Sequence, residues 1–329
     1  MRLSAALNEP WQLANGAEVR IGASIGISLF PQHGNSPAEL LQQADAALYQ
    51  AKAEGRGRFT YFSESLTHAA RERIELEARL RRAIAQNELR VFYQPQMDIA
   101  TGRIIGAEAL VRWQDPVEGF IPTNRFIPVA EESGLISAVG EWVLNETCLQ
   151  GQRWLEAGLP PLTLAVNVSP HQFLSGDLVE VVSRTLVTTG FPATRLELEL
   201  TEGALMNRQK EAVDMLNRLR AIGVRLAIDD FGTGYSSLAY LKRFPLDVLK
   251  IDKSFVDDIP DSQDDKEIAA AIVVMAHTLR FKVLAEGVET AEQLAFLQGQ
   301  GCDSYQGYLK SPPLPPDAFA KLLIESRLE

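Results

Sequence analysis

The sequence predicts a TIM-type (β/α)8 barrel with an antiparallel first strand, preceded by a small α+β fragment. From residue 89 onward, eight short apolar segments alternate with amphipathic helical segments, as in a barrel of roughly 250 residues. Most of these apolar segments stop on a carboxylate, an amide or a lysine, and catalytic residues of such barrels gather at strand ends. A doubly wound open sheet is the alternative fold, but its usual glycine-rich phosphate loop is missing after the first strand.

The sequence of residues 1–62 predicts only a few strands and helices, which are too few for an independent domain. The apolar run 18–30 is predicted to be a strand that forms a hairpin with the segment before it. Residues 37–53 place apolar side chains on one face and follow a Ser36 cap, so they predict a helix. A short strand is expected at 58–62.

Residues 63–88 predict a charged helix, which suits a connector, the first helix of the barrel or a dimer seam. The barrel is expected at 89–329. Its first two strands are separated only by the turn around Gly102, which is too short for a helical crossover, so they should pair antiparallel. The predicted strands are 91–95, 104–113, 163–169, 196–202, 224–230, 247–252, 282–287 and 302–306.

Composition excludes several classes of protein. A hydrophobic content of 46% in 329 residues is enough for a normal core. The net charge of −11 argues against binding to a nucleic-acid polymer. Two cysteines indicate a reducing compartment. No apolar stretch approaches the roughly 20 residues of a membrane helix, so we expect a cytoplasmic chain without membrane contact, or the cytosolic part of an anchored protein.

Polar side chains stand at the ends of six predicted strands, where they add nothing to a core. Carboxylates with one amide oxygen form a hard ligand set that suits Mg²⁺ or Mn²⁺. Two such ions about 3.5 to 4 Å apart are used for phosphodiester hydrolysis. Asp229 and Asp230 are adjacent and point in different directions, so one can bridge two ions while the other binds one. The strand-end residues are Glu108, Asn167, Glu199, Asp229, Asp230, Lys250 and Glu286.

The motifs around these residues resemble those of the EAL-domain cyclic di-GMP phosphodiesterases, which hydrolyse the cyclic dinucleotide to linear pGpG. The resemblance runs from about residue 71 to the C-terminus, and the ordered set of motifs is far more specific than any one of them. The matching segments are YQP at 93–95, EALVRW at 108–113, NVS at 167–169, ELTE at 199–202, DDFGTGYSSL at 229–238, KID at 250–252, EGVE at 286–289 and QGY at 306–308.

The resemblance implies hydrolysis by a metal-activated water, with four groups of site residues. The implied ligands of one ion are Glu108, Asn167, Glu199 and Asp229, and those of the second are Asp229 and Asp230. Lys250 and Glu286 are implied to orient and activate the water. The implied substrate contacts are Gln94, Leu110, Arg112, Glu289 and Gln306. A regulatory loop is implied at Phe231, Gly232 and Gly234, steadied by Glu202.

The resemblance also implies cofactors and partners. Two Mg²⁺ or Mn²⁺ ions are expected, with Ca²⁺ inhibitory because of its larger size and looser geometry. A homodimer is expected, and the loop is the expected route for control by an upstream region. The alternative function is a catalytically inert cyclic di-GMP receptor, a role of EAL domains that have lost metal ligands. None of those ligands is missing here, which favours the enzyme.

Residues 1–62 carry a second resemblance. The segments SIGISLF and ADAALYQAKAEGRGRF are similar to the last third of a GGDEF diguanylate cyclase domain. The nucleotide-binding GG(D/E)EF turn is absent from the sequence, so cyclase activity is excluded for this chain. An upstream sensory or GGDEF region is expected if the natural protein is longer.

Overall fold

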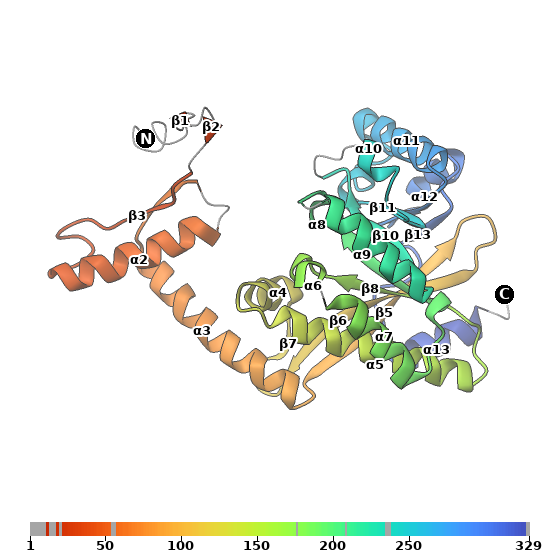
Figure 1. Ribbon diagram of the computed structural model, residues 1–329, viewed down its shortest axis with the longest axis horizontal. Helices are drawn as coiled ribbons and strands as arrows, with labels where there is room; N and C mark the ends of the chain where they lie inside the picture. Colours follow the sequence, from red (N-terminus) through yellow and green to blue (C-terminus); the bar gives the residue numbers. More distant parts are fainter. Residues whose placement is uncertain are drawn as a thin grey trace. The chain divides into compact units, whose positions relative to one another are not determined.

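Two compact units make up the chain, residues 1–79 and residues 80–329. They are seen in a computed structural model (Figure 1), which describes residues 11–12, 18–19, 22–53, 57–175, 177–207, 209–233 and 238–326.

The first unit contains two short strand pairs. Strands β1 (Trp11–Gln12) and β2 (Glu18–Val19) pair antiparallel. Strands β3 (Ile25–Ile27) and β4 (Phe59–Tyr61) pair parallel. The prediction of one continuous strand over 18–30 is therefore wrong, because residues 22–24 between β2 and β3 are not in a strand. Only three residues of the run 18–30 pair with β4. The sequence pattern does not indicate where this pairing begins or ends.

Helix α2 (Pro37–Ala53) packs closely on β3. Its backbone approaches Gly26 so closely that a Cβ there would lie 2.0 Å from the Ala44 carbonyl oxygen. The predicted cap is confirmed, since the Glu39 amide donates to Ser36 Oγ at 3.2 Å. The charged helix is α3 (Glu64–Ala85), which runs through the boundary between the two units.

The second unit is a closed barrel of eight strands, which confirms the predicted fold. Hydrogen bonding follows the order β5, β13, β12, β11, β10, β9, β8, β6, and pairing of β5 with β6 closes the ring. As predicted, β5 runs antiparallel to both of its neighbours. The extra strand β7 (Gly119–Ile121) pairs with β6 outside the ring. The barrel strands are β5 (Leu89–Asp98), β6 (Ile104–Asp115), β8 (Thr163–Val168), β9 (Leu196–Thr201), β10 (Arg225–Phe231), β11 (Val248–Ile251), β12 (Lys282–Ala285) and β13 (Ser304–Gln306).

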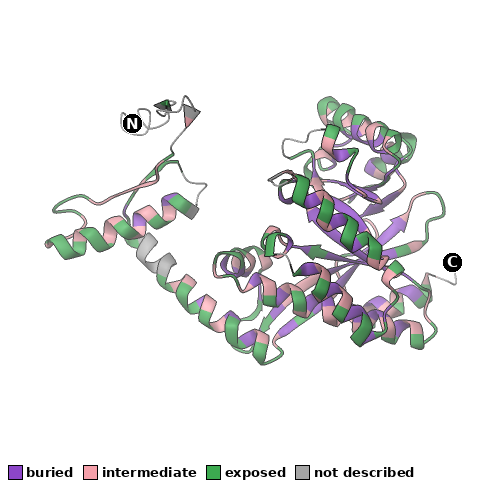
Figure 2. Cartoon of the chain, in the orientation of Figure 1, coloured by how far each residue is buried: buried purple, intermediate pink, exposed green. Residues whose placement is uncertain are grey.

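Helices cover the outside of the ring, and α5, α7 and α9 lie along the sheet in Figure 1. Burial is concentrated in the strands, while the outer helix faces are exposed (Figure 2). No helix among the described residues is both long and apolar enough to cross a membrane. The helices are α4 (Thr123–Glu132), α5 (Ile136–Glu156), α6 (Pro170–Ser175), α7 (Leu178–Thr189), α8 (Glu202–Asn207), α9 (Gln209–Ile222), α10 (Leu238–Leu241), α11 (Gln263–Thr278), α12 (Ala291–Gly299) and α13 (Pro316–Glu325), with 3-10 turns η1 (Ala193–Arg195) and η2 (Lys253–Phe255).

Strand alternation decides which side chains enter the barrel. Residues two apart on one strand share a face, so Glu197 shares its face of β9 with Glu199. On β5, Gln96 likewise shares a face with Gln94. Because β5 runs antiparallel, Gln96 and Glu197 both lie one step closer to the amino ends of the parallel strands. The barrel therefore has an upper level at the carboxyl ends and a lower level beneath it.

Candidate functional site

A buried lysine joins four carboxylates at the upper level of the barrel. Lys250 on β11 is 1% exposed. Its Nζ lies 2.6 Å from Glu286 Oε1, 2.9 Å from Glu199 Oε2, 3.1 Å from Asp229 Oδ1 and 3.8 Å from Glu108 Oε2. These carboxylates come from β9, β10, β6 and the residue after β12. Four segments far apart in sequence thus converge on one ammonium group.

This cluster holds more negative charge than its lysine can balance. Burial raises the pKa of Glu199 well above its usual value. Lys250 lowers this pKa and the nearby carboxylates raise it further, so the net shift is upward. Burial alone would lower the pKa of Lys250, but the surrounding carboxylates, Glu108 first, raise it well above its usual value. The ammonium therefore stays charged, and further positive charge would be stabilised here.

The oxygen atoms of the cluster fit a hard divalent cation. Neither carboxylate oxygen of Glu199 has a hydrogen-bond donor among the described residues, although both are buried; its contact with Lys250 is an ion pair without hydrogen-bond alignment. One oxygen each of Asp229, Asp230 and Glu286 lies within 4.8 Å of the others. Buried carboxylate oxygens without donors are the ligands that Mg²⁺ and Mn²⁺ prefer. The structure thus places Glu286, predicted to act on the water, beside the predicted ligands.

An irregularity in β10 brings both aspartates to the site. The register between β10 and β11 shifts between Ile228 and Phe231. Asp230 adopts a left-handed conformation with φ of 53°, and its amide donates to Asp229 Oδ1 at 3.0 Å. In a regular strand, adjacent side chains point to opposite faces, whereas a bulge re-aims one of them. The sequence predicts that the two aspartate side chains point in different directions, but it does not predict this bulge.

Two amide side chains donate to the carboxylate of Glu108. Asn167 Nδ2 donates to Glu108 Oε1 at 2.6 Å, and Gln306 Nε2 donates to Glu108 Oε2. Gln306 also donates to Gln94 Oε1 at 3.1 Å. Gln94 in turn donates to the Ser311 carbonyl at 3.3 Å. Four residues predicted for metal or substrate binding, Asn167, Glu108, Gln306 and Gln94, therefore form one hydrogen-bonded chain.

A cavity of about 320 Å³ lies beside this chain and is lined by Leu110, Arg112 and Asn167. The Arg112 guanidinium lies 5.7 Å from the centre of the Phe92 ring, and its Nη1 donates to the Val111 carbonyl at 2.8 Å. A guanidinium held in this way suits a phosphate oxygen. Two of the predicted substrate contacts thus share a cavity with a predicted metal ligand.

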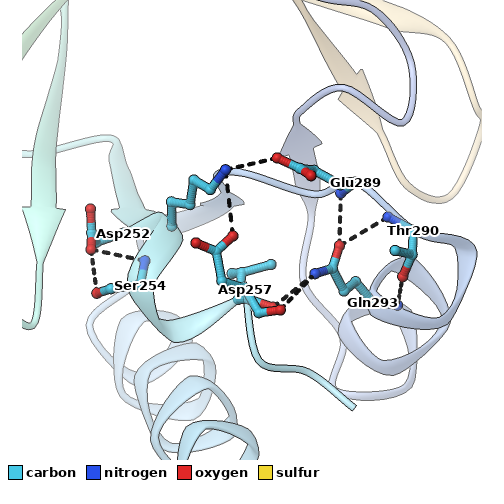
Figure 3. Close-up of polar contacts among 8 residues, drawn as sticks. Asp252, Ser254, Asp257, Glu289, Thr290 and Gln293 are labelled. Carbon is cyan, nitrogen blue, oxygen red and sulfur yellow. Dashed lines mark hydrogen bonds and ion pairs between the residues drawn. The ribbon is translucent and has the colours of Figure 1, made fainter. Parts of the chain in front are cut away.

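Glu289 forms a separate cluster with residues that sequence reasoning missed (Figure 3). Lys253 Nζ lies 2.7 Å from Glu289 Oε1 and 3.5 Å from Asp257 Oδ1. Gln293 accepts from the amides of Glu289 and Thr290, and it donates to the Val256 carbonyl. Thr290 and Gln293 form a capping box on α12. Their spacing in the sequence could have identified Gln293 as the residue that binds the Glu289 backbone.

The predicted regulatory loop is anchored to the barrel at Gly232. Its amide donates to Glu202 Oε2 at 3.0 Å. Gly232 has φ of 103°, and a Cβ there would lie 2.6 Å from Phe255 Cε2. Both facts favour glycine at this position. Phe231 is buried, and Gly234 lies outside the described residues.

The charge cluster predicts how the stability of the metal-free protein depends on pH. Burial raises the pKa of Glu286 from 4.5 to about 8, an effect that Lys250 only partly offsets. Between these values the folded state keeps a proton that the unfolded chain has released, so stability is lost as pH rises through this window. Urea unfolding in EDTA should show a fall of up to about 1 kcal/mol per pH unit between pH 5 and 8.

Glu286→Gln is the matched variant for this measurement, because it removes the titrating group and keeps the shape of the side chain. Its unfolding free energy should depend less on pH over the same range. An identical slope in the variant and the parent protein would show that Glu286 does not cause the effect.

Comparison with known proteins places this geometry in a family. The EAL domain family model matches residues 77–313. The chain belongs to the EAL domain family. The diguanylate cyclase GGDEF domain model matches residues 1–58, so the EAL domain follows a GGDEF fragment, as the two resemblances predicted.

Relatives of this EAL domain include two with named activities. Cyclic di-GMP phosphodiesterase NbdA of Pseudomonas aeruginosa is 45% identical over 100% of this chain and 42% of its own length. Cyclic di-GMP phosphodiesterase PdeR of Escherichia coli is 38% identical over 92% of this chain and 46% of its own length. The chain spans less than half the length of these curated relatives.

Solved structures support the same assignment. The PaMucR phosphodiesterase in complex with c-di-GMP is 43% identical and matches with a TM-score of 0.73, covering 74% of this chain and 99% of that chain. This agreement extends over most of the EAL domain described above.

Proposed function

We propose that this EAL domain hydrolyses cyclic di-GMP to linear pGpG in the cytoplasm. The observation that carries the proposal is the buried cluster around Lys250, where four carboxylates converge within 3.8 Å of one ammonium group. It occurs in a chain that is 45% identical to a protein named as a cyclic di-GMP phosphodiesterase. An inert receptor would have no need for this costly concentration of buried charge.

The proposed metal site uses the oxygen ligands at the strand ends, and Mg²⁺ or Mn²⁺ suits them. Glu108, Asn167, Glu199 and Asp229 would hold one ion, and Asp229 with Asp230 would hold the other. When bound, the two ions supply Lewis-acid activation of water and stabilise the charge on the phosphoryl oxygens. Asn167 is exposed at the end of β8, so its amide oxygen can serve as a ligand while Nδ2 holds Glu108.

The protein's own groups then bind the substrate and move a proton. Arg112 pairs with a phosphate oxygen from the wall of its cavity, beside Leu110. Gln94, Glu289 and Gln306 contact the nucleotide and orient the scissile phosphodiester. Glu286 accepts the proton of the attacking water.

Lys250 supports this chemistry from within the carboxylate cluster. Its ammonium lies 2.6 Å from Glu286, so it fixes the position of that carboxylate during proton transfer. It also offsets the negative charge that develops on the phosphoryl group. Burial keeps water from screening either interaction.

The direct test is chromatography of cyclic di-GMP incubated with the full chain and either Mg²⁺ or Mn²⁺. Linear pGpG should appear with each ion, and Ca²⁺ in excess should inhibit its formation. If intact dinucleotide persists with the enzyme above the substrate concentration while binding is retained, the chain is a receptor and the enzymatic proposal fails.

Glu286→Gln tests the proton acceptor. The glutamine keeps the size of the side chain but cannot take a proton, so turnover should fall by about 10² or more. Calorimetric titration with Mn²⁺ should show binding retained, because Glu286 is proposed to act on the water. Parental turnover in the variant would refute the assignment, and loss of Mn²⁺ binding would make Glu286 a ligand instead.

The remaining proposals concern assembly. We propose that residues 63–88 connect the GGDEF fragment to a barrel at 89–329, and that two chains associate as a homodimer. Anchoring of Gly232 to Glu202 would let dimer contacts or an upstream region reach the ligand Asp230 through the loop. Light scattering of the purified chain measures its molar mass and so tests the dimer.

A further inference from the structure

A second cavity lies at the opposite end of the barrel from the carboxylate cluster. It measures about 560 Å³ and is lined by the first residues of several strands, including Thr163, Arg225 and Ser304. None of its lining residues belongs to the candidate active site. A volume of this size is ordinary for a small-molecule site.

The lower level of the barrel combines small residues with larger ones such as Val248 and Leu284, which line the cavity. Barrels of this type usually fill their interior with bulky branched side chains. Here Gly106 and Ala165 stand one step below Glu108 and Asn167 on their strands. A Cβ at Gly106 would lie only 2.7 Å from Gln96 Oε1, so the Gln96 side chain uses the space that glycine leaves.

Gln96 provides a buried donor that nothing in the structure satisfies. The residue is 4% exposed and lines the cavity. Its Nε2 has no hydrogen-bond partner within the part of the chain that the structure describes. A buried donor without a partner costs free energy, and an acceptor bound in the cavity would remove that cost.

Three arginines line the same cavity and retain donor capacity. Arg225 uses Nε to bind Glu197 Oε2 at 3.0 Å, and its two Nη groups make no recorded contact with that carboxylate. Arg195 donates over 3.4 Å to the Pro161 carbonyl, and this is its only side-chain hydrogen bond to the residues that the structure describes. The Arg103 guanidinium forms no ion pair with the residues that the structure describes.

The acidic groups of the wall are already engaged by the protein. Asp303 accepts from Lys282, from the Val283 amide and from His277. Asp98 Oδ1 accepts from the amide and hydroxyl of Thr101. The donors that remain, namely guanidinium groups and the Gln96 amide, are those that bind planar or tetrahedral oxyanions.

We propose that this lower cavity binds a small molecule through its phosphate or carboxylate group, with Arg195 and Arg225 pairing with the oxyanion and Gln96 Nε2 donating to it. The site is separate from the hydrolytic centre, and its occupancy does not depend on cyclic di-GMP turnover.

Equilibrium dialysis of the full chain in EDTA against radiolabelled inorganic phosphate, and separately against malonate, tests the proposal. We expect saturable binding of at least one of the two anions. Binding of phosphate alone, malonate alone or both identifies the group that the cavity accepts. Arg195→Met and Gln96→Leu should each weaken binding by roughly ten-fold, because each removes a donor to an anion.

Two control variants locate the bound anion. Arg184→Met removes an exposed charge that pairs with Glu141 on the outer helices, so it should leave binding unchanged. Arg112→Met removes the guanidinium proposed to bind phosphate in the upper cavity, so any binding lost in this variant belongs to that cavity and not to the lower one. Circular dichroism checks that Gln96→Leu folds, and Arg195→Met carries the test if it does not. Absence of saturable binding for both anions, or binding that responds to Arg112→Met but not to Arg195→Met, would overturn the proposal.

Discussion

Asp229→Asn should lower the rate of cyclic di-GMP hydrolysis by roughly 10³-fold or more. Asp229 Oδ1 lies 3.1 Å from Lys250 Nζ. One carboxylate oxygen each of Asp229, Asp230 and Glu286 lies within 4.8 Å of the other two. It is the one carboxylate proposed to bind both ions, so its loss weakens both sites. The amide keeps the size of the side chain but carries no charge to attract a cation.

Two measurements separate this effect from a folding defect. Formation of pGpG is followed by chromatography at saturating Mn²⁺, and Mn²⁺ affinity is measured by calorimetry. Asp214→Asn is the matched control, because it removes one aspartate charge from the exposed face of α9 and should leave both quantities unchanged. Parental activity in Asp229→Asn would exclude Asp229 as a bridging ligand.

Much of this site could be predicted because its residues lie at strand ends. The parallel strands β8, β10, β11 and β12 are apolar over most of their buried length, so a carboxylate or lysine near the end stands out in the sequence. The closed ring then brings the ends together, as it does for Glu199, Asp229 and Lys250. The convergence of these residues can therefore be predicted without knowing any individual side-chain contact.

Contacts between side chains from different segments could not be predicted in the same way. The pairing of Lys253 with Glu289 joins η2 to the loop before α12, and the approach of these segments depends on the register of the barrel strands. The left-handed backbone at Asp230 could not be predicted. Aspartate adopts this conformation more often than most non-glycine residues, but only at a small fraction of its positions. In the first unit, the pattern over 18–30 indicates strand character but does not show where a partner strand is available.

Lys250→Met should destabilise the metal-free protein by about 3 to 5 kcal/mol. Methionine fills a similar volume, but it leaves the carboxylates of Glu108, Glu199, Asp229 and Glu286 without their shared ammonium. Glu108, Glu199 and Asp229 are buried and Glu286 is only partly exposed, so solvent compensates little for the lost charge. Urea unfolding in EDTA measures the loss. Lys321→Met, at an exposed position on α13 whose lysine lies 3.9 Å from Glu325, should change the unfolding free energy little.

Divalent cations should reverse part of this loss, because they supply the positive charge that the methionine lacks. Saturating Mg²⁺ should therefore raise the unfolding free energy of Lys250→Met by more than it raises that of the parent protein. Turnover should nevertheless stay at least about 10²-fold below the parent, since no group then positions Glu286 or offsets the phosphoryl charge. If Mg²⁺ stabilises variant and parent equally, the carboxylates that surround Lys250 are not the metal ligands. If turnover recovers fully with the metal bound, Lys250 only stabilises the fold.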